Sequence, residues 1–327
     1  MFMIIGGNRF LITGGAGLMG SHITEQLLAK GASEIILLDN FVRGSMHNIE
    51  ESLKDGRVKL VKGDIRDLDL LRRLATDIDG IYHMAALRIT ACADDPREAT
   101  EVMLSGTHNV IQTAVEQKVG KLMYASSASV YGLADVFPTN ETHHAFNNRT
   151  LYGTAKIAGE GMARSFAEMY GLRYVALRYF NVYGPRMDIF GKYTEVLIRW
   201  LDRIDAGQPP VIFGDGTQTM DLVYIDDVTD ANIIAMESDV TDEVFNVASG
   251  IETSLLDLLQ AVLRVTGSTL KPEFFPARSV NPVPRRLADT KKAENILGFK
   301  AKVDVEEGLR RLIAWRKEII ARKSAVV

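Results

Sequence analysis

The first half of the chain alternates short apolar runs with longer amphipathic stretches. The stretches Met19–Lys30, Ala99–Gln117 and Leu151–Tyr170 have the apolar spacing of helices that bury one face. The apolar runs are bounded by polar residues or glycine, which is typical of strands buried on both faces of a parallel sheet. The predicted strands are Arg9–Thr13, Ile35–Leu38, Val58–Val61, Ile81–Met84, Lys121–Ala125 and Tyr174–Tyr179. This alternation predicts an α/β fold built on a doubly wound parallel sheet.

The pattern changes after about residue 181, where glycine, proline and aspartate punctuate shorter segments such as 207–210 and 214–216. We therefore expect residues 1–181 to form the sheet domain and residues 182–327 to form a smaller α/β lobe. The chain is expected to return to the first domain over about 222–248. A last amphipathic stretch, Val305–Arg322, predicts a closing helix.

Composition excludes several classes of protein. The 327 residues are 46% hydrophobic and 24% charged, as in ordinary globular proteins, and the net charge of −4 offers no basic field for nucleic acid or anionic membranes. Cys92 is the single cysteine, so an intrachain disulfide and a multi-cysteine zinc site are excluded. The six histidines, including the adjacent His143 and His144 in a predicted loop, show no metal-ligand spacing. The apolar start is interrupted at Gly6 and predicts neither a signal peptide nor a membrane anchor, which favours a cytoplasmic location.

A glycine-rich turn follows the first predicted strand. Gly14, Gly17 and Gly20 lie between this strand and the start of a helix, in a Gly-x-x-Gly-x-x-Gly string. Gly14 permits a tight turn, Gly17 lets the backbone approach a pyrophosphate, and Gly20 lets helix and strand pack closely. The helix N-terminus then offers free N–H groups and the positive end of its dipole to the phosphates. The context indicates a Rossmann-type dinucleotide site.

An acidic residue, Asp39, ends the second predicted strand about twenty residues beyond Gly20. At this spacing a carboxylate accepts hydrogen bonds from the adenosine ribose, and it would repel a 2′-phosphate, so NAD is favoured over NADP. The nearby Arg43 weakens that preference slightly. The alternative is a glycine-rich turn with a solvated aspartate that only closes a βα unit.

Tyr152 and Lys156 lie four residues apart on a predicted helix and therefore share one face. A free tyrosine has a pKa of about 10, and lowering it by ~3 units requires ~4 kcal/mol. An ammonium and a cationic nicotinamide ring close by would both favour the phenolate. Ser127 follows the strand Lys121–Ala125, at the sheet edge where ligands bind, and its hydroxyl could hold the substrate oxygen that loses its proton. Alternatively, Tyr152 and Lys156 lie on an exposed helix surface, and Ser127 is only a residue of the turn that follows the strand.

Further motifs accompany these residues in a fixed order. They are Gly63-Asp64-Ile65, His83-Met84-Ala85-Ala86, the Arg-Tyr-Phe-Asn-Val-Tyr-Gly-Pro run at 178–185, and the segments 213–219 and 224–228. Together they resemble the extended short-chain dehydrogenase/reductases over nearly the whole chain. The last two segments resemble the substrate lobe of nucleotide-sugar epimerases and dehydratases.

The resemblance implies an NAD-binding Rossmann domain at 1–181, a substrate-binding lobe at 182–327 and a homodimer that pairs the helices Ala99–Gln117 and Leu151–Tyr170. The catalytic residues would be Ser127, Tyr152 and Lys156. The expected cofactor-binding residues are Gly14, Gly17, Leu18, Met19, Gly20, Asp39, Asn40, Gly44, Asp64, Ile65, Met84, Ala85, Ala86, Arg88, Tyr152, Lys156, Tyr179 and Phe180. The expected substrate-binding residues are Ser127, Asn181, Arg278 and Arg286. No metal is expected.

The residues beside Ser127 bear on the reaction. In the family that this chain resembles, 4,6-dehydratases carry an Asp-Glu pair after this position, and UDP-glucuronate decarboxylases carry a glutamate two residues after it. This chain has Ala128 and Ser129 at these places. A C4-epimerase of a UDP-hexose such as UDP-glucose or UDP-galactose therefore fits, because a tyrosine base and the cofactor suffice. The alternatives are another nucleotide-sugar enzyme (decarboxylase, dehydratase or net dehydrogenase/reductase) and a dinucleotide sensor without chemistry.

Two positions depart from the family pattern. Met220 stands where epimerase-like sequences often have an arginine that clamps the substrate diphosphate, and Met103 stands where an asparagine is common. Met220 cannot form charge-assisted hydrogen bonds, so Arg278, Arg285 or Arg286 would have to replace that contact, unless they form only a solvated basic loop. The missing amide at Met103 could change a hydrogen bond at the cofactor site. These departures leave the identity of the nucleotide sugar open.

Overall fold

The computed structural model describes residues 3–190, 195–277 and 283–324. Within these ranges the central sheet has seven strands, all parallel, in the order β10-β6-β5-β4-β1-β2-β3. The strands are β1 (Arg9–Thr13), β2 (Glu34–Asp39), β3 (Val58–Lys62), β4 (Gly80–His83), β5 (Lys121–Ser127), β6 (Tyr174–Tyr179) and β10 (Glu243–Val247). The strand order reverses between β1 and β4, which creates a crevice at their carboxyl ends. The prediction of a Rossmann-type doubly wound sheet is confirmed.

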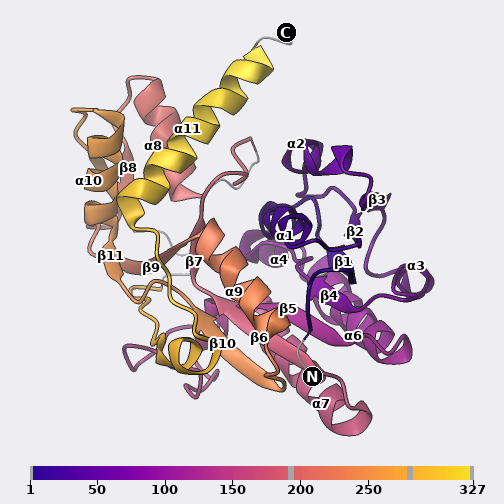
Figure 1. The fold of residues 1–327 in the computed structure, drawn as a ribbon. Helices are drawn as coiled ribbons and strands as arrows, with labels where there is room; N and C mark the ends of the chain where they lie inside the picture. Colours follow the sequence, from indigo (N-terminus) through magenta and orange to yellow (C-terminus); the bar gives the residue numbers. More distant parts are fainter. Residues whose placement is uncertain (1–2, 191–194, 278–282, 325–327) are drawn as a thin grey trace.

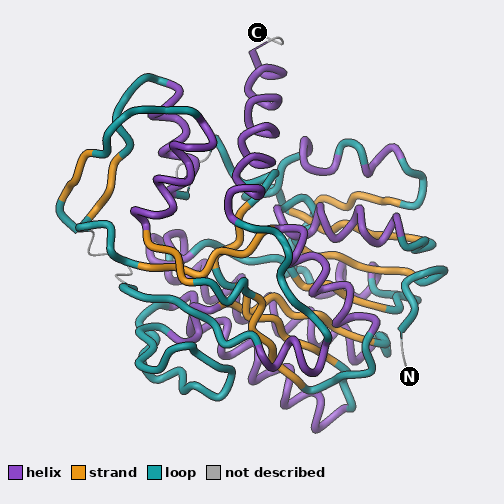
Figure 2. The backbone as a smooth tube through the Cα atoms, turned by 60° about the vertical axis from the view of Figure 1, so that its left-hand side comes forward, coloured by secondary structure: helices purple, strands orange, loops and turns teal. Residues whose placement is uncertain are grey.

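Helices cover both faces of this sheet (Figures 1 and 2). One core joins side chains such as Ile12 and Leu37 to α1 (Leu18–Ala29) and α9 (Ile225–Glu237). The other joins alternate strand residues such as Leu11 and Ile36 to α3 (Leu68–Leu74), α6 (Thr107–Glu116) and α7 (Leu151–Tyr170). Because successive strand residues point to opposite faces, the continuous apolar runs of the sequence supply both cores.

The helix predicted over Ala99–Gln117 is divided into three parts. It consists of α5 (Pro96–Thr100), a widened π-type turn η2 (Glu101–Gly106) and α6. Gly106 lies against Ile65, since a Cβ at this position would come within 2.7 Å of the isoleucine side chain. The segment therefore bends close to the turn that follows β3. The remaining short elements of this half are α2 (Met46–Ile49), η1 (Ser52–Lys54), α4 (Ile89–Asp94) and η3 (Ala128–Tyr131).

A second lobe forms around its own apolar core, to which Trp200, Ile212 and Leu312 contribute. Its strands form a three-stranded sheet, β11-β9-β7, and a parallel pair, β12-β8. The elements are β7 (Asn181–Tyr183), α8 (Val196–Asp205), β8 (Val211–Phe213), β9 (Thr219–Tyr224), β11 (Glu252–Ser254), α10 (Leu255–Thr266), β12 (Glu273–Phe275) and α11 (Val305–Ser324). The short segment η4 (Ala293–Leu297) instead packs against the first core, next to β10.

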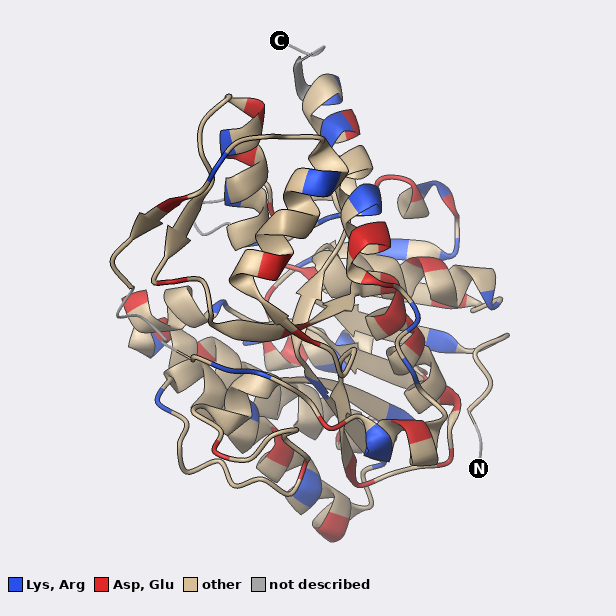
Figure 3. Ribbon diagram, turned by 90° about the vertical axis from the view of Figure 1, so that its left-hand side faces the viewer, with Lys and Arg blue, Asp and Glu red and all other residues tan. Residues whose placement is uncertain are grey.

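The chain crosses between the lobes after β9. In Figure 1, α9 and β10 lie with the strands of the central sheet although they follow β9 in sequence, and α11 projects upward with the C-terminus. No helix within the described ranges combines the length and apolarity needed to cross a membrane. Acidic and basic residues are interspersed over the face drawn in Figure 3. The domain boundary at residue 181 and the cytoplasmic location stay predictions.

Candidate functional site

The glycine turn packs tightly between β1, β2 and β4. Gly14 has a φ of +71°, and a Cβ on it would lie 2.8 Å from the Ala85 nitrogen. A Cβ on Gly20 would overlap the Gly14 carbonyl oxygen, so only glycine lets α1 approach the turn this closely. The first turn of α1 has neither a side-chain cap nor an acidic residue. Its N–H groups and dipole are therefore available to a phosphate.

Asp39 is buried at the end of β2 and connects the glycine turn to the loop after the strand. Its Oδ2 accepts a hydrogen bond from the Ala16 nitrogen at 2.9 Å, and its Oδ1 accepts one from the Phe41 nitrogen at 2.8 Å. A Cβ on Gly44 would come within 2.6 Å of the same carboxylate. An ionised carboxylate has about four acceptor positions, so two remain for the hydroxyls of a ribose.

A cavity of about 390 Å³ opens from this turn into the space between the two lobes. Most residues that the sequence analysis assigns to the cofactor line it: Gly14, Gly17, Leu18, Met19, Asp39, Asn40, Gly44, Asp64, Ile65, Met84, Ala85, Ala86, Arg88, Tyr152, Lys156 and Tyr179. Gly20 and Phe180 do not line it. Gly20 packs beneath the turn, and Phe180 packs with Ala128, Tyr131 and Ala248 in a separate small core.

Two ion pairs border the cavity. Arg66 holds the Asp64 carboxylate at 2.8 Å and lowers the pKa of that carboxyl to about 2, and the Asn40 amide donates to the same group. Asp64 thus stays ionised at physiological pH. On the opposite side, Arg88 reaches across the cavity to Asp188 of the second lobe at 3.4 Å.

The three expected catalytic residues come together at the carboxyl end of β5. Thr150 caps α7 by accepting a hydrogen bond from the Gly153 nitrogen, which fixes the turn that carries Tyr152. The Tyr152 hydroxyl is hydrogen-bonded to Ser127, and the Lys156 Nζ lies 5.7 Å from the Tyr152 ring centre. The structure therefore brings Ser127, Tyr152 and Lys156 into one group.

The electrostatics of Tyr152 differ from the sequence-based expectation. Burial raises the pKa of the Tyr152 phenol, and the hydrogen bond with Ser127 and the charges of Arg43 and Arg286 counteract this rise. Lys156 instead donates to the Ala125 carbonyl oxygen at 2.5 Å, and burial lowers the pKa of its ammonium to about 8. Arg43 and Arg286, both distant from Tyr152 in sequence, therefore add positive charge near the phenol, while the Lys156 ammonium lies 5.7 Å from its ring centre.

A buried polar network lies directly beneath this group. Glu160 on α7 accepts a hydrogen bond from the Ser126 hydroxyl and forms an ion pair with Arg178 on β6 at 2.7 Å. Arg178 also donates to the Tyr131 hydroxyl at 2.9 Å, which in turn donates to Asn246 on β10 at 2.6 Å. The network joins α7 to three strands at the edge where the catalytic side chains stand.

The residues expected to contact substrate, and the alternative Arg285, have different surroundings. Arg286 lies beside the catalytic group: its Nη1 donates to the Ala128 carbonyl oxygen at 2.9 Å, and burial lowers its pKa to about 10. The Asn181 Oδ1 is buried and has no hydrogen-bond partner within the described part of the chain. Arg285 is turned away, because it pairs with Glu252 at 2.7 Å and covers the Phe137 ring. Arg278 lies outside the described residues.

The two unusual methionines have structural partners. The Met103 sulfur accepts a hydrogen bond from the Leu87 nitrogen at 3.1 Å, beside the residues that line the cavity. Met103 thus holds the backbone after β4 without an amide side chain. Met220 lies on β9, paired with Thr253, and packs against the core of the second lobe.

Some cavity residues were missed from the sequence. Trp315 and Ile319 of α11 form part of the wall. Arg186, just after β7, also lines the cavity; its Nη2 pairs with Glu25 of α1, while its Nη1 is buried without a hydrogen-bond partner in the described structure. The Arg186 charge acts with burial to lower the pKa of His22 on α1 to about 4. All three residues come from the second lobe, and no local spacing marks them.

Comparisons with known proteins agree with this geometry. Residues 10–248 match the model of the NAD dependent epimerase/dehydratase family. A putative UDP-glucose 4-epimerase of Methanocaldococcus jannaschii is 34% identical over 94% of this chain and 98% of its own length. A UDP-N-acetyl-alpha-D-glucosaminuronate decarboxylase of Bacillus cytotoxicus is 32% identical over 95% and 98%. The solved UDP-N-acetylglucosamine 4-epimerase of Methanobrevibacter ruminantium M1, in complex with UDP-N-acetylmuramic acid, superposes with a TM-score of 0.91 at 30% identity, covering 96% of this chain and 99% of the other.

Proposed function

Since the chain belongs to the NAD-dependent epimerase/dehydratase family, we propose that it inverts C4 of a UDP-hexose such as UDP-galactose or UDP-glucose. The residues of the cavity fit NAD. The glycine turn and the uncapped start of α1 suit the pyrophosphate, and Asp39 keeps acceptor positions for the adenosine ribose. The nicotinamide end would then lie toward Tyr152 and Tyr179, which line the same cavity.

The residues beside Ser127 are the observation that favours epimerisation over dehydration or decarboxylation. Elimination of water needs its own acid and base, but Ala128 and Ser129 supply no carboxyl group. Glu160, which reaches the neighbouring Ser126, is held by two hydrogen bonds from Arg178 and is not free to exchange protons with a sugar. Because relatives include both an epimerase and a decarboxylase, this local chemistry favours the epimerase.

In the proposed mechanism Tyr152 removes the proton from the sugar 4-hydroxyl while Ser127 holds that oxygen. The positive charges of Arg43 and Arg286 favour the phenolate form of Tyr152, which accepts this proton. The glycine turn and Asp39 would hold NAD, which would supply reversible hydride transfer at C4 of the sugar. Tyr152 then gives the proton back to the oxygen, so neither a proton nor cofactor is consumed.

We further propose that Arg286 contacts the substrate diphosphate in place of the arginine that Met220 replaces. Its Nη1 is engaged by the Ala128 carbonyl, but a guanidinium has five N–H donors in a planar fork. Its position beside Tyr152 would place a diphosphate at the entrance to the catalytic group. The homodimer expected through α6 and α7 stays a prediction.

Arg186 is expected to bind the cofactor pyrophosphate from the second lobe, because its unpartnered Nη1 is buried at the cavity next to α1. Losing one charge-assisted hydrogen bond of about 1.5–3 kcal/mol corresponds to an affinity loss of about 10- to 100-fold. Arg186→Met should therefore weaken NADH binding to cofactor-depleted protein by that factor, measured by NADH fluorescence titration. Arg264→Met, which removes an exposed partner of Glu306, is the control and should bind NADH normally. Equal affinities in both variants would contradict this role.

The first test of the proposed reaction is proton NMR of UDP-galactose with purified protein and no added cofactor. Growth of the UDP-glucose anomeric signal to a steady mixture is the expected result. An unchanged spectrum, with NAD nevertheless released on denaturation, would reject this substrate and direct the same assay to other nucleotide sugars. Release of carbon dioxide from UDP-glucuronate would favour the decarboxylase alternative. Absence of any NAD affinity would contradict the cofactor site itself.

A further inference from the structure

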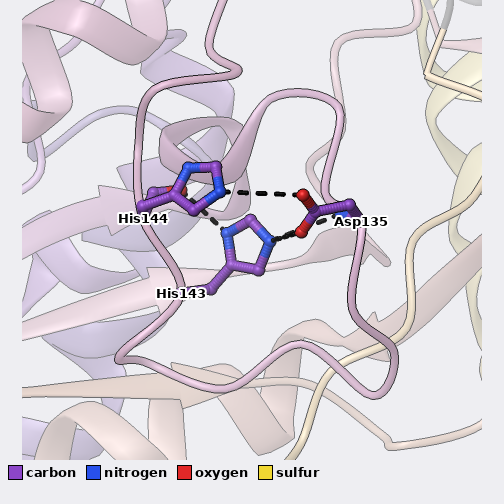
Figure 4. A group of neighbouring side chains, drawn as sticks. All are labelled: Asp135, His143 and His144. Carbon is purple, nitrogen blue, oxygen red and sulfur yellow. Dashed lines mark hydrogen bonds and ion pairs between the residues drawn. The ribbon is translucent and has the colours of Figure 1, made fainter.

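Three potential metal ligands converge in the loop between η3 and α7, outside the catalytic group. The Nε2 of His143 lies 2.7 Å from one carboxylate oxygen of Asp135, and the Nε2 of His144 lies 3.7 Å from the other. Figure 4 shows both imidazole rings facing the carboxylate. The candidate ligand atoms all lie within 4.8 Å of one another. The sequence shows no metal-ligand spacing at the adjacent histidines, because it does not reveal that the loop brings Asp135 to them.

The separations suit a tetrahedral ion. Bonds of about 2.0–2.2 Å to nitrogen and oxygen at tetrahedral angles place neighbouring ligand atoms roughly 3.3–3.5 Å apart. The two nitrogen-to-oxygen separations, 2.7 Å and 3.7 Å, bracket this range, and all the ligand atoms lie within 4.8 Å of one another, so shifts on the order of 1 Å would complete the geometry. Asp135 and His144 are half exposed, with side-chain exposures of 59% and 53%, which leaves access for the ion and a water ligand.

His143 is held in the orientation of a ligand. Its Nδ1 lies 2.8 Å from the His144 carbonyl oxygen, which can only accept a hydrogen bond, so Nδ1 carries a proton. Its ring is buried and meets Tyr131 edge to face at 5.9 Å. In the neutral form Nε2 presents a lone pair toward Asp135, whose backbone nitrogen lies 3.3 Å away and whose carboxylate oxygen lies 2.7 Å away. A proton on Nε2, or a metal ion bound by both residues, makes the contact with the carboxylate favourable. A backbone carbonyl on the second ring nitrogen is the usual support of a metal-binding histidine.

We propose that Asp135, His143 and His144 bind a divalent transition-metal ion that prefers nitrogen and oxygen ligands, of which Zn²⁺ is the representative. A proton on His143 can also bridge to Asp135, so the ion competes with protonation. The His144 Nδ1 accepts from the Phe146 nitrogen at 3.3 Å, and this long hydrogen bond is lost when Nε2 binds the ion. His144 is thus the weaker ligand. The bound ion would join Asp135 to His143 and His144 within the segment between Ser127 and Tyr152.

The test is titration of chelator-treated, tag-free protein with ZnCl₂ by calorimetry, together with the visible spectrum of the Co²⁺ form. We expect one equivalent of saturable Zn²⁺ binding and the absorption of a tetrahedral Co²⁺ site. His143→Ala and Asp135→Asn should weaken binding by about tenfold or more, and the exposed His144→Ala somewhat less. His108→Gln is the control, since His108 contacts Phe166 on α7 instead of the cluster, and it should bind as the unaltered protein does.

Two results would overturn the proposal. One is the absence of saturable Zn²⁺ binding in the unaltered protein. The other is equal affinity in the cluster variants and in His108→Gln, which would place the ion elsewhere. Circular dichroism of each variant establishes that it is folded. If His143→Ala does not fold, the Asp135 and His144 variants decide the outcome, because both side chains are more than half exposed.

Discussion

Replacing Tyr152 with phenylalanine is expected to lower kcat for the nucleotide sugar by about a thousandfold, within the 10²- to 10⁴-fold range of general acid–base catalysis. The substitution removes the hydroxyl that bonds to Ser127 and leaves the ring in its place on α7. The charges of Arg43 and Arg286 would then have no phenolate to stabilise. Substrate would still bind, but its 4-hydroxyl would keep its proton.

The measurement combines turnover by proton NMR with the NAD content of the denatured protein. NAD is expected to remain bound, because the glycine turn, Asp39 and the rest of the cavity are unchanged. Tyr170→Phe, at the exposed end of the same helix, is the matched control and should retain full activity. Activity above a few per cent in Tyr152→Phe would remove Tyr152 from the role of base. Loss of NAD would show that the hydroxyl serves the cofactor instead.

The fold could be predicted from sequence where the physical signal is local. Strands buried on both faces, such as β1 and β6, leave continuous apolar runs with sharp polar limits, and their predicted bounds agree with the structure. The short strands of the second lobe could not be found in this way. β7, β8 and β11 each have three residues, too few for an alternating pattern, and they exist only because distant segments pair with them.

The residues of the candidate site also differ in whether a local sequence pattern predicts them. The glycine turn and the Tyr152–Lys156 pair have fixed spacings within one element, and the structure places them around one cavity. Arg186, Trp315 and Asp188 reach that cavity from the second lobe, where no spacing relates them to the first. Arg43 illustrates the limit: the sequence shows a charge near the ribose, whereas its effect on the Tyr152 phenol depends on how the loop after β2 folds over the cavity.

The buried ion pair beneath the catalytic group gives the second large expected effect. Glu160→Leu should lower the free energy of unfolding by about 3–5 kcal/mol, the usual cost of leaving one charge of a buried pair without its partner. Both side chains are only 11% exposed, so water cannot replace the lost carboxylate. Arg178 would keep the Tyr131 hydroxyl and the Glu141 carbonyl as acceptors, but these are uncharged. Urea unfolding of the single variant measures the loss.

The double variant Glu160→Leu/Arg178→Met separates the charge from the packing. Because it removes both ions and restores apolar contacts, it should recover most of the lost stability, as replacement of a whole buried pair often does. The exposed pair Arg264–Glu306 is the control, and the corresponding double replacement there should change stability by less than about 1 kcal/mol. A double variant no more stable than Glu160→Leu would mean that the unpaired Arg178 charge is not the source of the cost. The loss would then belong to the hydrogen bond with Ser126, and the network would serve chiefly to fix the strand that presents Ser127.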